Sequence, residues 1–350
     1  MRITDISTRR RGLGETEEMG GGKMIRTIVL GVGSFGEKRA RAVKESLFGE
    51  LVGVADADME RAAQVAQRLN VGRFSIDEVF EKETDVMCVA TPNKYHTPLT
   101  IRALESGKHV LCEKPLSLNA EEVRKMVEAS KKTGKFLKMG SNHRYFTSVM
   151  RAYEIFKSGE LGDIVGFNGR IGNNGERVKE SWFWDKEVSG GGTLLDNGCH
   201  LIDIARWFMG DFSKVMGVTS NIYWKECPVE DTACGIFVTN NGRMAVISSC
   251  WRQMAGYLHF EINGTDGYIT VDGRFDTHGG DKVYWQGNGG KTIRCEDFGH
   301  IPPNSYVLEL DDFYMALQNG RQPEPSGEDG LKIMGMIDAI YKNNGKEVNL

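Results

Sequence analysis

Apolar runs alternate with amphipathic stretches over the first 145 residues of the chain. The run 85–90, for example, is almost continuously apolar. Strands that are buried on both faces have this pattern, and amphipathic helices between them cover a parallel sheet. The pattern therefore predicts a doubly wound α/β domain, with strands at 26–31, 51–56, 73–75, 85–90, 108–112 and 136–139 and helices at 35–48, 59–69, 96–107 and 119–133.

The pattern changes after residue 145. A helix at 147–158, a strand at 164–171 and a helix at 193–209 come first. Strands without helices between them follow, and they indicate an α+β domain with an open-faced, mostly antiparallel sheet. We expect these strands at 214–224, 232–239, 243–251, 257–264, 267–272, 281–286 and 291–297, and closing helices at 305–318 and 328–343.

A chain of 350 residues is long for one hydrophobic core, so two domains are expected. We predict an N-terminal tail at 1–23, the doubly wound domain at 24–145, the α+β domain at 146–330, and a C-terminal helix and tail at 331–350. The tail holds three arginines at 9–11, but few large apolar residues follow them. An export signal needs an apolar segment, so we predict that the tail is not one.

Charge and cysteine content narrow the function classes. A net charge of −4 argues against nucleic acid or a membrane surface as the main partner. The seven cysteines are scattered without a C-x-x-C pair, which favours reduced thiols in the cytoplasm. His143, Cys199 and His200 do not have a recognised metal-ligand spacing, so no metal site is expected.

A glycine motif, Gly31-x-Gly33-x-x-Gly36, links the first strand to the first helix. Gly31 permits a tight turn, Gly33 lets a pyrophosphate approach the backbone, and Gly36 allows close helix–strand packing. The helix then directs its free N–H groups at the phosphates. The chain contains 43 glycines, so a chance glycine-rich turn is the alternative.

Asp56 ends the second strand, twenty residues after Gly36. A carboxylate at this place accepts hydrogen bonds from the ribose hydroxyls of NAD and repels the 2′-phosphate of NADP. Arg61 and Arg73 are near enough in sequence to offset that repulsion. The sequence therefore favours NAD, with NADP less favoured.

Two further motifs follow strands of the same sheet. The segment 91–93 and the segment 113–115 both lie where ligands bind in doubly wound sheets, beyond the carboxyl ends of the strands. Lys114 could there hold a substrate hydroxyl or help to carry its proton. A surface lysine in a turn is the equally weighted alternative.

Asp196 and His200 lie four residues apart in the predicted helix 193–209 and share one face. A carboxylate beside an imidazole fixes its tautomer and stabilises its charged form, as a general base requires. Two alternatives stay open, because Thr193 and Asp196 fit a helix-capping box and a lone helical histidine is often a core residue.

Four motifs together resemble the Gfo/Idh/MocA oxidoreductases, the group of glucose–fructose oxidoreductase and inositol 2-dehydrogenase. The match runs from about Met24 to Tyr341. It comprises G-V-G-S-F-G at 31–36, A-T-P-N-K-Y-H at 90–96, E-K-P at 113–115 and G-G-G-T-L-L-D-N-G-C-H-L-I-D at 190–203.

The resemblance implies a Rossmann domain and a separate catalytic role for each of three side chains. Lys114 would contact the reacting hydroxyl, His200 would accept its proton, and Asp196 would support His200, while the nicotinamide takes the hydride. It also implies a homodimer or homotetramer formed through the C-terminal sheet. We expect cofactor contacts from Gly31, Gly33, Ser34, Phe35, Gly36, Asp56, Thr91, Pro92, Asn93, His96, Glu113 and Lys114, and substrate contacts from Arg144, Tyr145, Trp182 and Asn197.

The function that follows is an NAD(H)-dependent dehydrogenase or reductase. Its substrate would be a secondary alcohol or ketone on a sugar, a cyclitol or a nucleotide sugar. A dihydrodiol- or imine-type reductase is one alternative, and a non-catalytic dinucleotide-sensing regulator is another. The set Lys114, Asp196 and His200 favours the enzyme, since a sensor has no use for a proton relay.

Overall fold

The computed structural model describes residues 23–273, 281–299, 301 and 304–350, so the expected tail lies outside the described residues except for Lys23. The chain divides into two compact units. Unit 1 comprises residues up to 117, 121–145 and 304–331, and unit 2 comprises 118–120, 146–303 and 332–350. The prediction that 304–330 belongs with the second domain is therefore wrong.

Unit 1 is built on a six-stranded parallel sheet in the order β3-β2-β1-β4-β5-β6. From β1, the strands β2 and β3 extend the sheet to one side, and the strands β4, β5 and β6 extend it to the other side. This order confirms the doubly wound fold. The strands are β1 (Ile25–Leu30), β2 (Gly49–Ala55), β3 (Gly72–Phe74), β4 (Val86–Val89), β5 (His109–Glu113) and β6 (Leu137–Gly140). The helices are α2 (Ser34–Glu45), α3 (Met59–Leu69), α4 (Glu78–Glu81), η1 (Asn93–Tyr95), α5 (His96–Glu105), α6 (Ala120–Thr133), η2 (Asn142–Tyr145) and α10 (Ser305–Gln318).

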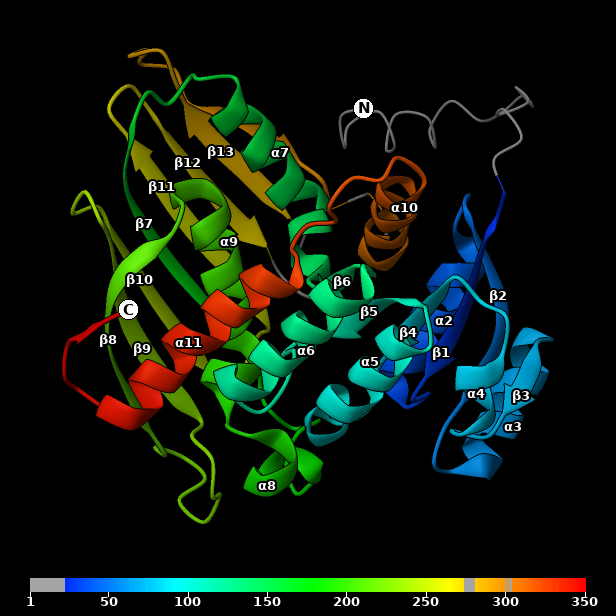
Figure 1. Ribbon diagram of the computed structural model, residues 1–350. Helices are drawn as coiled ribbons and strands as arrows, with labels where there is room; N and C mark the ends of the chain where they lie inside the picture. Colours follow the sequence, from blue (N-terminus) through cyan, green and yellow to red (C-terminus); the bar gives the residue numbers. More distant parts are fainter. Residues whose placement is uncertain (1–22, 274–280, 300, 302–303) are drawn as a thin grey trace. The chain divides into compact units, whose positions relative to one another are not determined.

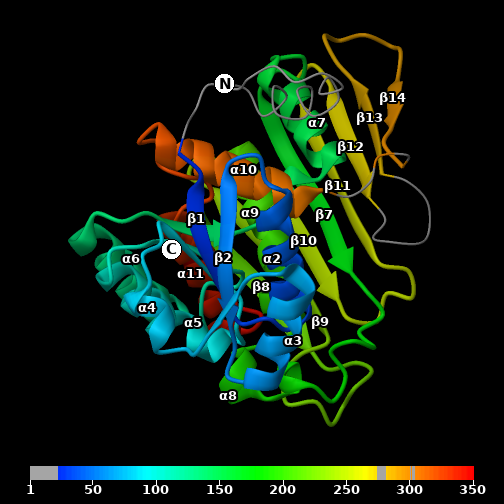
Figure 2. The same ribbon diagram turned by 90° about the vertical axis from the view of Figure 1, so that its right-hand side faces the viewer.

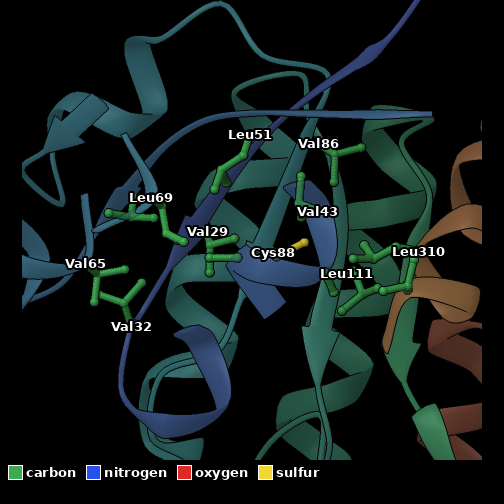
Figure 3. Packing of buried hydrophobic residues seen from close by; sticks show 14 of the residues in the cluster. Val29, Val32, Val43, Leu51, Val65, Leu69, Val86, Cys88, Leu111 and Leu310 are labelled. Atoms are coloured by element: carbon green, nitrogen blue, oxygen red, sulfur yellow. The ribbon is translucent and has the colours of Figure 1, made fainter. Parts of the chain in front are cut away.

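The helix α10 belongs to unit 1 because its apolar residues complete the core on the face of the sheet that α2 and α3 cover. Val29, Leu111 and Leu310 are fully buried in one cluster there (Figure 3). The Tyr314 hydroxyl also lies 2.8 Å from the Thr27 hydroxyl of β1. Burial of each large side chain contributes roughly 1.5–3 kcal/mol, which is ample to fix a helix of fourteen residues.

Unit 2 contains a nine-stranded sheet in the order β14-β13-β12-β11-β7-β10-β9-β8-β15. Its neighbouring strands are antiparallel except for β7 and β10, which run parallel. The strands are β7 (Ile164–Gly172), β8 (Phe212–Ser220), β9 (Thr232–Thr239), β10 (Met244–Cys250), β11 (Tyr257–Gly264), β12 (Tyr268–Gly273), β13 (Lys282–Gln286), β14 (Arg294–Asp297) and β15 (Val348–Asn349). The helices are α7 (Thr147–Lys157), η3 (Trp182–Trp184), α8 (Lys186–Ser189), η4 (Leu194–Gly198), α9 (Cys199–Met209) and α11 (Gly327–Asn343), which enters this unit at Lys332.

The helices α7 and α9 lie over one face of the nine-stranded sheet (Figures 1 and 2). Side chains on this face are buried, as Ala245 and Ile247 of β10 are. Alternate residues point to the opposite face, where Met244 is 56 % and Val246 is 38 % exposed. The sheet is thus open on one face, as predicted.

Two local features of unit 2 differ from the prediction. The helix expected at 193–209 begins as a π-helical turn, η4, and continues as α9. The short edge strand β15 was not expected, since two residues carry no pattern. Within the part of the chain that the structure describes, no helix is long and apolar enough to cross a membrane.

The π-helical turn follows a glycine run that packs against Glu230. A Cβ atom on Gly192 would lie 1.9 Å from the Glu230 carbonyl oxygen, so only glycine fits there. The Glu230 carboxylate accepts hydrogen bonds from the N–H groups of Gly192 and Leu194, both at 2.9 Å. Its Oε1 atom also accepts one from the Tyr341 hydroxyl at 2.9 Å. A buried carboxyl group thus satisfies the free donors where the turn begins.

We predict that Glu230→Gln lowers the free energy of unfolding by about 1–3 kcal/mol, because an amide offers one acceptor oxygen and leaves a backbone N–H unpaired. Burial raises the pKa of Glu230, whereas hydrogen bonds from the Leu194 and Gly192 N–H groups and from the Tyr341 hydroxyl act against that rise. Denaturant titration measures the change, with Glu226→Gln at an exposed position of the same loop as control. Equal stability of the two variants would contradict the assignment.

Candidate active site

The glycine turn of unit 1 has the geometry that a dinucleotide requires. Gly31 has φ +86°, and a Cβ atom there would lie 2.7 Å from the backbone of Ala90 and Thr91. On Gly36 it would lie 1.8 Å from the Gly31 carbonyl oxygen, whereas on Gly33 it would meet nothing within 4 Å. Two glycines therefore permit close packing, and the third leaves open space beside the backbone.

Asp56 is fixed against this turn. Its Oδ2 atom accepts a hydrogen bond of 2.7 Å from the Val32 N–H, and its Oδ1 atom accepts one of 2.9 Å from the Asp58 N–H. Arg61 lies beside it, with Nη1 3.5 Å from Oδ1, and the Arg61 side chain is 48 % exposed. The carboxylate and the guanidinium thus stand together at the end of β2.

The remaining predicted cofactor residues of unit 1 lie near the carboxyl ends of β1 and β4. Ser34 is exposed and Phe35 is half-buried at the start of α2. Thr91 and Pro92 are half-buried, while Asn93 is buried. Their contacts with a cofactor stay predictions.

Lys114 is half-buried and directly follows β5, and the Lys114–Pro115 peptide bond is cis. Its charge acts on two imidazoles. Burial lowers the pKa of His143 well below its ordinary value, and the Lys114 charge lowers it further. Burial also lowers the pKa of His96, with Lys114 contributing in the same direction. Sequence analysis weighed His143 only as a metal ligand and missed its place near Lys114.

Glu113 and His96, both expected to contact the cofactor, make hydrogen bonds within unit 1. The Oε1 atom of Glu113 accepts two hydrogen bonds from Arg39, of 2.9 and 2.6 Å. His96 is 1 % exposed, with its ring nitrogens 2.9 Å from the Pro115 carbonyl oxygen and 2.7 Å from that of Thr91. Their cofactor contacts stay predictions, but these bonds give both side chains a structural role.

In unit 2, the acidic residue of the predicted pair is held by a tryptophan. The Trp251 indole N–H donates to Asp196 Oδ2 over 3.0 Å, and Trp251 is fully buried. Thr193 makes no side-chain cap, so the capping-box alternative is wrong. His200 is buried in the first turn of α9. The amide of Asn197 donates to the Thr193 hydroxyl over 3.2 Å.

Sequence analysis missed Trp251 because no motif marks it. It belongs to an aromatic cluster with Trp224, packed against Phe183 and Trp184. Trp182 is half-buried and stacks on Phe183, with ring centroids 3.9 Å apart. Trp182 is therefore joined through this cluster to the residue that holds Asp196.

Two of the expected substrate residues, Arg144 and Tyr145, lie in unit 1 and are 5 % and 3 % exposed. The Tyr145 hydroxyl donates to Asp312 Oδ2 of α10 over 2.8 Å. This bond assigns Tyr145 to the packing of α10, which argues against a substrate contact. Among the residues that the structure describes, no three His, Cys, Asp or Glu side chains gather so as to hold a metal ion.

Comparisons with known proteins agree with this geometry. Residues 25–141 match the model of an oxidoreductase family with an NAD-binding Rossmann fold. Residues 149–270 match the GFO/IDH/MocA C-terminal domain. The two matches together cover the parallel sheet of unit 1 and much of the open sheet of unit 2.

Characterised relatives align over most of the chain. The D-glucoside 3-dehydrogenase of Escherichia coli is 30 % identical, over 91 % of this chain and 95 % of that protein. The D-xylose 1-dehydrogenase (NADP(+)) 2 of Haloferax volcanii is 26 % identical, over 90 % and 96 %. The crystal structure of aldose-aldose oxidoreductase from Caulobacter crescentus, complexed with glycerol, has a TM-score of 0.84 at 25 % identity and covers 94 % of this chain and 100 % of that chain. The protein is therefore an oxidoreductase, and it belongs to the Gfo/Idh/MocA family.

Proposed function

We propose that the protein interconverts a secondary alcohol and a ketone on a sugar, cyclitol or nucleotide sugar, with NAD(H) as the hydride carrier. The observation that carries this proposal is the gathering of the glycine turn, Asp56 and Lys114 at the carboxyl ends of one parallel sheet. The relatives named above are dehydrogenases of sugars and glycosides, which supports the substrate class.

The residues present fit a dinucleotide. Gly33 leaves open space beside the first turn of α2, where a pyrophosphate can meet backbone N–H groups. Asp56 keeps acceptor capacity for ribose hydroxyls beside its two backbone bonds. The bound nicotinamide supplies the hydride acceptor in alcohol oxidation.

The chain itself supplies the proton chemistry. Lys114 donates a hydrogen bond to the substrate oxygen and favours its deprotonation through its positive charge. His200 takes the hydroxyl proton as the C–H electron pair leaves as hydride, and a C=O bond remains. Asp196, held by Trp251, stabilises the imidazolium that results.

We predict that His200→Ala lowers kcat by about 10²–10⁴-fold, the usual contribution of a general base. Lys114→Ala should lower kcat and raise KM, because the same ammonium binds and activates the oxygen. Asp196→Asn keeps an acceptor for the Trp251 N–H but removes the charge, so it should lower kcat and shift the pH–rate profile. Steady-state rates on a polyol and sugar panel test this, with thermal melts and NADH titrations alongside.

The exposed Glu187→Gln on α8 serves as control for the loss of one acidic charge. Variants of His200, Lys114 and Asp196 that melt normally, bind NADH normally and turn over at parental rates would overturn the assignment of the chemistry.

Cofactor choice depends on Asp56 and Arg61. The carboxylate should favour NAD over NADP by about 1–3 kcal/mol in catalytic efficiency, because a 2′-phosphate would meet it directly. We predict that Asp56→Ser narrows this preference and that Arg61→Ala removes residual use of NADP. The ratio of kcat/KM values for the two cofactors is the measurement. Equal kcat/KM values of the parent protein with NAD and with NADP would contradict the proposal. One relative is named as NADP(+)-dependent, so membership of the family does not decide the outcome in advance.

We also propose a homodimer or homotetramer formed through the open face of unit 2. Four apolar residues on β8 and β10 are 38–56 % exposed there, namely Met216, Val218, Met244 and Val246. Neighbouring apolar residues on one face of a sheet are typical of an interface.

The seven cysteines, all without disulfides, support a cytoplasmic location.

We predict that Met216→Glu shifts the protein towards monomer in light scattering at micromolar concentration, because a charge would be buried in the interface. Met59→Glu is the matched control, since both methionines are 39 % exposed and Met59 begins α3 in unit 1. A monomeric parent protein with full activity would exclude this assembly.

A further inference from the structure

Both neighbours of Lys114 are tied to other elements of unit 1. On one side, Glu113 accepts two hydrogen bonds from the Arg39 guanidinium, which is itself fully buried. Arg39 also donates to Glu309 Oε2 over 2.8 Å. Two N–H groups of one guanidinium thus converge on the same carboxylate oxygen in charge-assisted bonds, which restrict rotation of the Glu113 side chain.

On the other side, the backbone is held by His96. Nδ1 of His96 lies 2.9 Å from the Pro115 carbonyl oxygen, and Nε2 lies 2.7 Å from the Thr91 carbonyl oxygen. The backbone of Thr91 in turn packs against Gly31, where a Cβ atom would lie 2.7 Å from the Thr91 nitrogen. One buried ring therefore connects the glycine turn to the residue after Lys114.

Loss of the His96 side chain would leave a buried carbonyl oxygen without its hydrogen-bond donor. Carbonyl oxygens only accept hydrogen bonds, and a neutral imidazole carries a single N–H, so the ring donates to one of the two oxygens at a time and to both only as the imidazolium. Because only 1 % of the His96 surface is exposed, water cannot take over its hydrogen bond to a carbonyl oxygen unless the surrounding chain rearranges. A small shift of the Pro115 backbone would move the neighbouring lysine, and misplacement of a catalytic group by about 1 Å can lower a rate about 100-fold.

We propose that His96 is a positioning residue, which sets Lys114 through Pro115 and aligns it with the cofactor turn through Thr91. This inference rests on the proposed function of Lys114. It differs from a direct cofactor contact, because both ring nitrogens lie within hydrogen-bond distance of the chain's own carbonyl oxygens.

Three substitutions separate the two contacts. In His96→Asn the amide nitrogen can occupy the place of Nδ1, in His96→Gln it can occupy that of Nε2, and in His96→Phe neither contact can form. We expect His96→Phe to lower kcat about 100-fold and to weaken NADH binding. His96→Asn should regain most of kcat but bind NADH weakly, while His96→Gln should bind NADH normally and keep a low kcat.

The chain offers a matched control in His109. It begins β5, the strand that ends at Glu113, and its Nδ1 accepts the Phe136 N–H over 3.0 Å. His109→Phe also removes an imidazole and its hydrogen bond from unit 1. His109 is half-buried and lies at the end of β5 that is far from Lys114. It should lower the melting temperature and leave kcat and NADH affinity unchanged.

Hydrogen exchange of the segment 113–117 gives a readout that does not depend on turnover. We expect faster exchange in His96→Phe than in His109→Phe, and restoration in His96→Asn. Unchanged exchange in His96→Phe, or equal kcat losses in the Asn and Gln variants, would overturn the inference. A parent protein that oxidises no sugar would instead overturn the proposed function, and the exchange and NADH titrations would still decide the role of His96.

Discussion

The architecture of unit 1 depends on the burial of one charge. Arg39 is fully enclosed, and a buried guanidinium is costly unless carboxylates pair with it. Glu113 and Glu309 provide this pairing, at 2.6 and 2.8 Å. Because the three residues come from α2, β5 and α10, their pairing joins the glycine-turn helix, the strand before Lys114 and a helix from the end of the chain.

The same pairing explains where sequence analysis failed on domain boundaries. The apolar spacing of 305–318 predicted a packed helix, and the structure confirms it. Spacing does not reveal which core a helix joins, however. Glu309 and Asp311 are fully buried, whereas a carboxylate in a helix is ordinarily assigned to its solvent face. Their partners lie up to 270 residues away, and local pattern carries no signal over that distance.

The strands and the glycine turn were predictable because their causes are local. Continuous apolar runs follow from burial on both faces, and Gly31 follows from a backbone that other residues rarely adopt. The supporting residues of the site were not predictable in this way. Trp251 meets Asp196 across 55 residues, and Glu230 meets Gly192 across 38. The π-helical turn is likewise set by contacts of the glycine run and not by the propensities of 193–198.

The proposed chemistry is thus supported by buried polar bonds in each unit separately. In unit 1, Arg39 fixes the Glu113 side chain and His96 holds the Pro115 carbonyl oxygen, on the two sides of Lys114. In unit 2, Trp251 holds Asp196, and Glu230 satisfies the backbone donors of the turn that carries it. A buried polar group without its partner costs more than the bond itself contributes, so each supporting residue makes the alternative placements of its neighbour unfavourable. The stability of each unit and the placement of Lys114 or Asp196 within it therefore depend on the same bonds.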